Sequence, residues 1–147
     1  MERKKSKLSG SFVLDSSVVI KWFSEEDETE LALSLREGFL KGDVDIIVPD
    51  LQLYEIANAL RFNKKLNAAD VANAVNSLIG IGINIVVPTK DVISSAVSLA
   101  FQFDTTFYDA YFIALAKELN YSFVTADEKL FNKIKSLKFA ILLKNLK

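Results

Sequence analysis

The sequence contains no cysteine and no histidine. The absence of cysteine excludes disulfide bonds and thiolate nucleophiles, and the absence of both residues excludes metal sites built on sulfur or imidazole. Imidazole acid–base catalysis is excluded for the same reason. Any bound metal must therefore be held mainly by oxygen ligands, which suit hard cations such as Mg²⁺ or Mn²⁺.

Membrane-spanning and secretory segments are also missing from the sequence. The apolar run at residues 78–87 is far shorter than the roughly 20 residues that a membrane helix needs, and it includes Asn84. The basic start of the chain leads into apolar residues 12–14, but Asp15 interrupts what would be the core of a signal peptide. We therefore expect an intracellular, cytoplasmic protein with no membrane association.

A basic excess, which is common among nucleic-acid-binding proteins, is not found either, since the formal net charge is -1. Half of the 147 residues are apolar and the mean hydropathy is +0.22. Such a chain can bury a large core in one domain and can still leave apolar surface for a partner. With no repeat, low-complexity tract or linker, we expect a flexible basic tail at residues 1–10 and a single domain at residues 11–147.

Short apolar runs alternate with helical patterns along the whole chain. Strands are predicted at 11–14, 45–48, 83–87, 121–124 and 139–142. Helices are predicted at 18–23, 29–40, 50–62, 67–79, 89–103, 107–120 and 127–135. Asp50 and Thr89 are expected to cap the helices that they begin. Alternation of buried strands with helices is typical of an α/β fold with a parallel sheet covered on both faces.

Four carboxylates are predicted to lie on one rim of this sheet. Asp109 is the only carboxylate between residues 107 and 116, in a helix so apolar that it should be buried. A buried carboxylate needs a hydrogen bond, an opposite charge or a metal. Asp15 and Asp127 follow predicted strands, and Glu55 lies in the second turn of a helix after another strand. Ligands of open α/β sheets bind beyond the carboxyl ends of the strands, so the pattern predicts an acidic metal site for phosphoryl transfer.

Each of these side chains also has a purely structural interpretation. Asp15 and Asp127 are good helix caps, and Asp109 suits the positive end of a helix dipole. Glu55 could be an ordinary residue on the flank of an amphipathic helix, and Thr125 is placed for a capping box. Taken singly, the structural interpretation is favoured for each residue, but four carboxylates on one rim favour the metal site.

Three stretches carry a resemblance to a known family: FVLDSSVVIKWF at 12–23, VPDLQLYEIANAL at 48–60 and FYDAYFIALAKELNYSFVTADEKL at 107–130. They resemble the PIN-domain ribonucleases, and in particular the VapC-type toxins of type II toxin–antitoxin systems. The likeness covers the chain from Phe12 onward. The acidic positions and the two hydroxyl positions of the family fall on Asp15, Glu55, Asp109, Asp127, Ser17 and Thr125.

The resemblance implies a three-layer α/β/α sandwich whose five parallel strands are ordered 3-2-1-4-5. It implies a Mg²⁺- or Mn²⁺-dependent endoribonuclease that hydrolyses phosphodiester bonds of structured RNA, such as tRNA or rRNA, and leaves a 5′-phosphate. Asp15, Asp109 and Asp127 would ligate the metal, and Glu55 would complete the catalytic carboxylates or orient the attacking water. The two hydroxyls would hydrogen-bond the carboxylates. A cognate antitoxin and a second copy of the chain, in a homodimer, are the implied protein partners.

Three other interpretations remain open at the level of sequence. A non-catalytic PIN-like module that binds RNA or protein would not need all four acidic positions, yet none is missing. A phosphatase or receiver-type domain with an aspartyl phosphate would favour a second carboxylate beside Asp15, where this chain has Ser16 and Ser17. A purely structural α/β domain leaves Asp109 unexplained.

Overall fold

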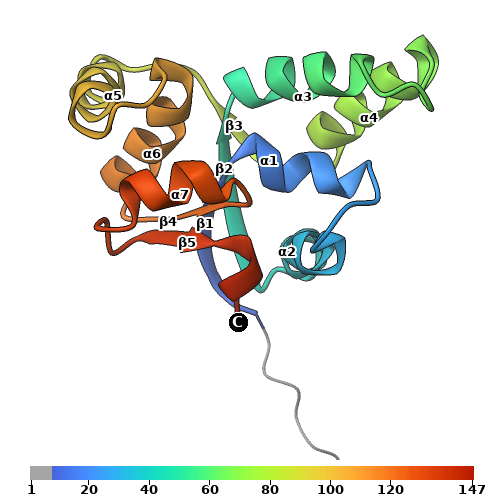
Figure 1. Ribbon diagram of the computed structural model, residues 1–147. Coiled ribbons are helices and arrows are strands. Elements are labelled where there is room, and N and C mark those ends of the chain that lie inside the picture. Colours follow the sequence, from blue (N-terminus) through green and yellow to red (C-terminus); the bar gives the residue numbers. More distant parts are fainter. Residues whose placement is uncertain (1–7) are drawn as a thin grey trace, which may run out of the picture.

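A computed structural model describes residues 8–147, in which helices cover both faces of a five-stranded sheet (Figure 1). The strands are β1 (Gly10–Leu14), β2 (Val44–Pro49), β3 (Asn84–Val86), β4 (Ser122–Thr125) and β5 (Ala140–Leu142). The helices are α1 (Ser16–Val19), α2 (Thr29–Lys41), α3 (Leu51–Arg61), α4 (Ala68–Gly80), α5 (Lys90–Phe103), α6 (Phe107–Leu119) and α7 (Glu128–Ile134), with short 3₁₀ helices η1 (Ile20–Trp22) and η2 (Leu143–Asn145). None of the helices within residues 8–147 has the length and apolarity needed to cross a bilayer.

Residues 1–7 of the predicted basic tail lie outside the described residues. The remainder of that predicted tail is part of the fold, because β1 already begins at Gly10 and Leu8 packs against the core. β1 thus begins one residue before the predicted start of the domain at residue 11, and the division into tail and domain stays a prediction.

The sheet is parallel throughout and its order is β3-β2-β1-β4-β5, which confirms the predicted 3-2-1-4-5 arrangement. β1 lies in the middle and pairs with both β2 and β4. In the register of β1 with β4, Leu14 lies beside Val124, so the residues that follow them leave the sheet at the same level. The order reverses at β1, and this switch point is where parallel α/β sheets place their ligands.

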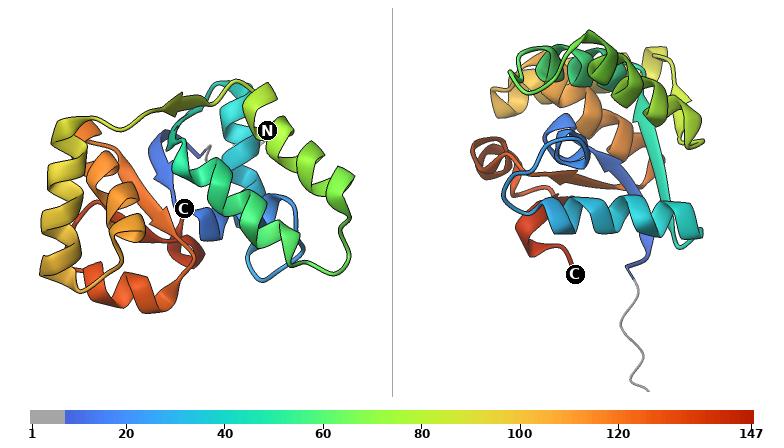
Figure 2. Two further views of the ribbon diagram at one scale, coloured as in Figure 1. Left: turned by 90° about the horizontal axis from the view of Figure 1, so that it is seen from above. Right: turned by 90° about the vertical axis from the view of Figure 1, so that its right-hand side faces the viewer.

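Alternate residues of β1 supply two separate cores. Phe12 and Leu14 pack into the cluster formed with α1 to α4, whereas Val13 packs into the cluster formed with α5 to α7. The view from above shows the sheet edge-on between these two groups of helices (Figure 2). The molecule is the predicted three-layer α/β/α sandwich.

Threonine side chains cap the N-termini of α5 and α6. Thr89 accepts a hydrogen bond from the Val92 N–H at 3.3 Å, and Thr106 accepts one from the Asp109 N–H at 3.1 Å. The predicted cap at Thr89 is confirmed. The predicted cap at Asp50 is wrong, because its backbone already has helical dihedrals and its side chain accepts no helix N–H.

Candidate metal centre

Asp15 is the most deeply buried carboxylate of the rim, with 6% of its surface exposed. It follows β1 directly, and its backbone N–H donates to the Val124 carbonyl at 2.8 Å. Although it occupies the N-cap position of α1, its side chain accepts no helix N–H. Instead, Oδ2 accepts hydrogen bonds from Ser17 Oγ at 2.6 Å and from Thr125 Oγ1 at 2.8 Å. The capping interpretation of Asp15 is therefore wrong, and its carboxylate is held on the rim by two hydroxyls.

These two hydroxyls are themselves fixed by the backbone of the loop after β4. Ser17 Oγ accepts the Ala126 N–H at 3.0 Å, and Thr125 Oγ1 accepts the Asp127 N–H at 3.1 Å. Because each oxygen accepts from an amide, its own proton is left to point at Asp15. Thr125 thus serves the carboxylate of Asp15 rather than a capping box.

The other three carboxylates belong to α3, to α6 and to the residue that precedes α7, all on the same rim. Glu55 Oε1 accepts a hydrogen bond from Ser16 Oγ at 2.7 Å, a partner that the sequence analysis did not identify. Asp127 is exposed, and its Oδ1 caps α7 by accepting the Leu130 N–H at 3.0 Å. Asp109 is half-buried in the first turn of α6. Asp127 therefore fulfils the structural interpretation as a cap, which leaves its second oxygen, Oδ2, free of that role.

Asp15, Glu55 and Asp109 each have a raised pKa, and the charge of a neighbouring carboxylate contributes to each shift. The pKa of Asp15 is raised to about 6, mainly by burial and to a smaller extent by the charges of Asp109 and Asp127, while the hydrogen bonds from the two hydroxyls act in the opposite direction. The pKa of Glu55 is raised by burial and by the charge of Asp15, which the hydrogen bond from Ser16 opposes. These mutual shifts mean that the four acids lie close enough together to repel one another.

The pKa of Asp109 is also raised by burial and by neighbouring carboxylates. Its pKa is raised by burial first and then by the charges of Glu55 and Asp127. The hydrogen bond at Thr106 and the charge of Lys133 act in the opposite direction, but they do not reverse the shift. A positive charge at this rim would therefore be stabilised by several carboxylates at once.

No basic side chain in the described part of the chain forms an ion pair with these acids. Within residues 8–147 the ion pairs join Lys21 to Glu26, Lys133 to Asp104 and Lys144 to Glu128, and none involves Asp15, Glu55, Asp109 or Asp127. In the same part of the chain, no group of three acidic side chains is placed to hold a metal ion directly. The predicted ligands Asp15, Asp109 and Asp127 therefore share a rim, but their side chains do not form a closed cage.

The donor set nevertheless fits a hard divalent cation. Every candidate donor is a carboxylate or hydroxyl oxygen, and the carboxylates have no basic partner in the described chain. Mg²⁺ usually keeps several waters and is bound through one or two carboxylates, so it does not require a three-carboxylate cage. Asp15, Asp109 and Asp127 would hold such an ion directly or through water.

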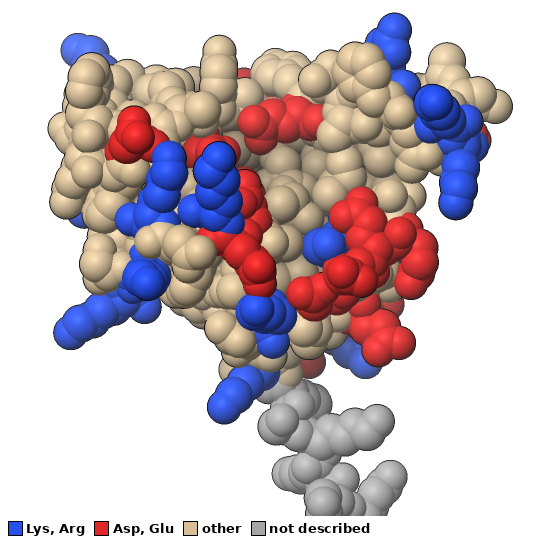
Figure 3. Space-filling view, viewed as in Figure 1, with Lys and Arg blue, Asp and Glu red and all other residues tan. Residues whose placement is uncertain are grey.

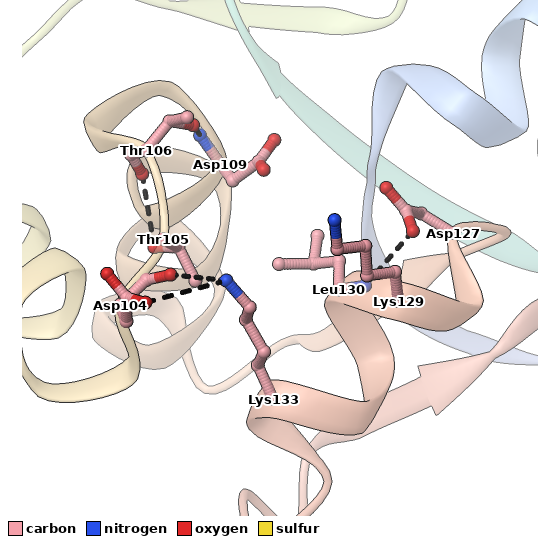
Figure 4. A pocket seen from close by; sticks show the side chains of 8 residues that line it. All are labelled: Asp104, Thr105, Thr106, Asp109, Asp127, Lys129, Leu130 and Lys133. Atoms are coloured by element: carbon pink, nitrogen blue, oxygen red, sulfur yellow. Dashed lines mark hydrogen bonds and ion pairs between the residues drawn. The ribbon is translucent and has the colours of Figure 1, made fainter.

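A hollow of about 440 Å³ opens beside the carboxylates, between α6 and α7. Asp109 and Asp127 line it together with Lys129 and Lys133 (Figure 4). On the molecular surface, acidic side chains run along the hollowed centre of this face with basic side chains next to them (Figure 3). The site is thus an acidic rim with a basic wall on one side.

Gln52 is a further residue of the site that the sequence analysis missed. It is 1% exposed, and its Nε2 donates to the Leu14 carbonyl at 2.6 Å. This carbonyl belongs to the last residue of β1, immediately before Asp15, so Gln52 fixes the backbone from which Asp15 projects. The signal was present in the sequence, because Gln52 is spaced four residues from Ile56 and eight from Leu60 on one helix face.

Comparison with known proteins identifies the family. Residues 12–137 match the PIN domain. The chain belongs to the PIN-domain family. No curated protein matches the chain. Membership of the PIN family supports a nuclease role for this protein.

Solved structures share the fold at low sequence identity. A toxin–antitoxin complex from Klebsiella pneumoniae contains a chain with 17% identity and a TM-score of 0.66, over 89% of this chain and 96% of that chain. VapBC-1 from nontypeable Haemophilus influenzae is similar at 16% identity and a TM-score of 0.66, over 92% and 99% of the two chains. Mycobacterium tuberculosis VapC20, described as a sarcin–ricin loop cleaving toxin, is similar at 13% identity and a TM-score of 0.63, over 82% and 93%. The PIN domain described here therefore has a VapC-like fold.

Proposed function

We propose that this PIN-domain protein is a Mg²⁺- or Mn²⁺-dependent endoribonuclease, the toxin of a VapC-type toxin–antitoxin pair. Its substrate would be a structured RNA of the tRNA or rRNA class. The observation that carries the proposal is the buried carboxylate of Asp15, which lies among three further carboxylates with no basic partner in the described chain. A carboxylate cluster of this kind is stabilised by a divalent cation, and RNA phosphodiester hydrolysis is chemistry that such a cation serves.

In the proposed reaction, different residues bind the metal and activate the attacking water. A bound divalent ion would supply positive charge and a more acidic water. Asp15 and Asp109, with Asp127, would hold the ion against the RNA phosphate. Glu55, which accepts a hydrogen bond from the Ser16 hydroxyl, would position the attacking water and accept its proton.

We also propose a cognate antitoxin and a second copy of the chain as partners. Large apolar side chains remain exposed on the surface, among them Tyr54, Phe62, Val87 and Phe101, the last with 87% of its surface exposed. An isolated apolar side chain needs no explanation, but several large ones on a domain of this size support partner surfaces. Similar folds solved as toxin–antitoxin complexes give further support to an antitoxin.

The decisive experiment compares matched aspartate variants in an RNA cleavage assay. Asp15→Asn and Asp109→Asn should each lower the rate of metal-dependent cleavage by at least ~100-fold, because each removes a carboxylate charge from the rim. Asp91→Asn is the control, since Asp91 also lies in the first turn of a helix but lines a different hollow. Total cellular RNA is incubated with Mn²⁺ or with a chelator, and the new 5′ ends are sequenced.

Undiminished cleavage by both rim variants, with the folded state verified by circular dichroism, would refute the catalytic assignment. The alternative, a non-catalytic PIN-like module that binds RNA or protein, is favoured by the absence of three directly converging acids in the described chain. That alternative predicts RNA or protein binding by the wild-type protein with no cleavage in either metal condition.

A further inference from the structure

Two lysines of one helix line the hollow beside the carboxylates. Lys129 and Lys133 lie one turn apart on α7, and in Figure 4 the side chain of Lys129 projects between those of Asp109 and Asp127. Side chains four residues apart lie on the same face of a helix. α7 therefore presents a pair of ammonium groups to a hollow that is otherwise acidic.

The two lysines differ in how they are held. Lys133 Nζ donates to the Asp104 carbonyl at 2.6 Å and lies 4.0 Å from Asp104 Oδ2. Lys133 thereby ties α7 to the turn between α5 and α6. The side-chain ammonium of Lys129 has no hydrogen bond or ion pair with any group in residues 8–147. Its ammonium is available to a ligand, whereas that of Lys133 is already occupied.

The lining of the hollow suits a sugar and a phosphate better than a base. The opposite wall supplies the hydroxyls of Thr105 and Thr106, and none of the described residues that line the hollow is aromatic. Proteins recognise unpaired RNA bases largely by stacking them on aromatic side chains, so the hollow lacks the usual platform for a base. Its volume of about 440 Å³ lies within the ordinary range for small ligands.

We infer that Lys129 is a substrate-binding residue whose ammonium contacts the RNA phosphate next to the one that is cleaved. The inference rests on the proposed nuclease function. Without this ammonium, a phosphate entering the hollow would meet Asp104, Asp109 and Asp127 opposed only by the occupied Lys133. Lys133 sets the width of the hollow by holding α7 to Asp104. Recognition at this position is through charge and hydroxyls, and it is therefore indifferent to the identity of the base.

Salt dependence of RNA binding tests the charge contact directly. Fluorescence anisotropy of a short single-stranded RNA of mixed sequence is measured against KCl, in an Asp15→Asn background so that the probe stays intact. Adding Lys129→Gln should reduce the slope of log K against log[salt] by about 0.7, the value for one phosphate contact on a single strand. Lys129→Arg should restore the slope. Lys117→Gln is the matched control, because Lys117 lies in the last turn of α6 and lines another hollow.

Backbone substitution tests the position of the contact in the protein with an intact Asp15. A single uncharged methylphosphonate linkage is moved along the RNA around the cleavage site, and kcat and KM are measured for each substrate. The wild-type protein should show a raised KM at one linkage beside the scissile one, and the Lys129→Gln variant should be insensitive to the substitution there. An abasic nucleotide at the same position should leave KM nearly unchanged.

The inference is overturned if Lys129→Gln and Lys117→Gln give the same salt slope, or if the abasic substitution is as harmful as the methylphosphonate. Either result leaves the nuclease assignment standing, provided that Asp15→Asn abolishes cleavage. A wild-type protein that neither binds nor cleaves RNA would remove the proposed function, and this inference with it.

Discussion

At the scale of single residues, Asp15 combines burial with a negative charge that its partners only partly offset. Its ordinary pKa of 3.8 is raised to about 6, mainly because the folded chain removes the carboxylate from water. The raised pKa stabilises the protonated native state below about pH 3.8, and this contribution is lost as the pH rises through about 6. At neutral pH the ionised Asp15 is therefore a local source of instability in the metal-free protein, retained at the rim where the cation is proposed to bind.

Replacing this charge should stabilise the metal-free protein. We expect Asp15→Asn to raise the free energy of unfolding at pH 7 by ~1–3 kcal/mol, since a pKa raised from 3.8 to about 6 corresponds to ~3 kcal/mol at most. The gain should shrink toward pH 4. Urea denaturation in chelator, for both proteins at pH 4 and pH 7, measures the difference. A variant that is less stable than the wild type at pH 7 would show that the hydroxyl hydrogen bonds outweigh the burial of the charge.

Sequence reasoning found the acids because each is a charged residue in an unexpected place. Asp109 stands alone in an apolar helix, and Asp15 interrupts an apolar strand-to-helix passage. Ser16 and Gln52 were missed because a serine beside a helix start and a glutamine in a helix are ordinary residues in sequence. Their roles depend on the distances to Glu55 and to the Leu14 carbonyl, which exist only in the folded chain.

At the scale of elements, the close contact of α2 with β2 depends on a residue without a side chain. A Cβ added at Gly38 of α2 would lie 2.6 Å from Cγ2 of the buried Val44 on β2. Val44 is β-branched and cannot rotate away freely. Gly80, in the last turn of α4, has no neighbouring atom within 4 Å of such a Cβ.

Replacing Gly38 and Gly80 by alanine should therefore change the free energy of unfolding in opposite directions. We expect Gly38→Ala to lower the free energy of unfolding by about 1 kcal/mol or more, because overpacking exceeds the gain in helix propensity. Gly80→Ala should raise it by up to ~1 kcal/mol through propensity alone. Denaturant midpoints of both variants, compared at one pH with chelator present, give the answer. Equal stabilisation by both would mean that α2 can move away from β2 at little cost.

The elements themselves were predictable from the sequence, and their ends less so. All five strands were found, but β3 is Asn84–Val86 rather than 83–87, and β4 is Ser122–Thr125 rather than 121–124. Helical periodicity alone predicts Leu53, Ala57 and Leu60 as the buried face of α3, and the structure shifts that face by one residue. Leu53 and Ala57 are only half-buried, whereas Gln52 and Ile56 are buried with Leu60. A tertiary hydrogen bond fixes this rotation of the helix, and periodicity does not contain that information.

At the scale of the whole molecule, the carboxylate rim joins the two halves of the sandwich. Asp15 follows the central strand, Glu55 belongs to a helix on one face, and Asp109 to a helix on the other. The strand order that brings them together came from the family resemblance, because alternating strands and helices do not by themselves fix an order. A ligand held on this rim would bind the folded chain and not the unfolded one.

Divalent metal should therefore protect the folded protein. We expect Mn²⁺ to raise Tm by an amount that grows with its concentration, since a ligand that binds only the native state stabilises it by about 1.4 kcal/mol per tenfold excess over Kd. Asp127→Asn should weaken this response, and Asp15→Asn should remove most of it. Thermal unfolding with and without Mn²⁺ provides the readout, with Asp91→Asn as the control that keeps the wild-type response. An unchanged response in the Asp127 variant would remove Asp127 from the ligand set.

One of the two hydroxyls that hold Asp15 comes from Thr125, 110 residues further along the chain. During translation the first strand leaves the ribosome long before the fourth has been made, and domains fold only as their segments emerge. An incomplete nascent chain that lacks β4 has neither Thr125 nor Asp127, so its Asp15 stays solvated and unaligned. If the chain is the nuclease we propose, a ribosome can synthesise most of it before any catalytic centre exists to damage the RNA around it.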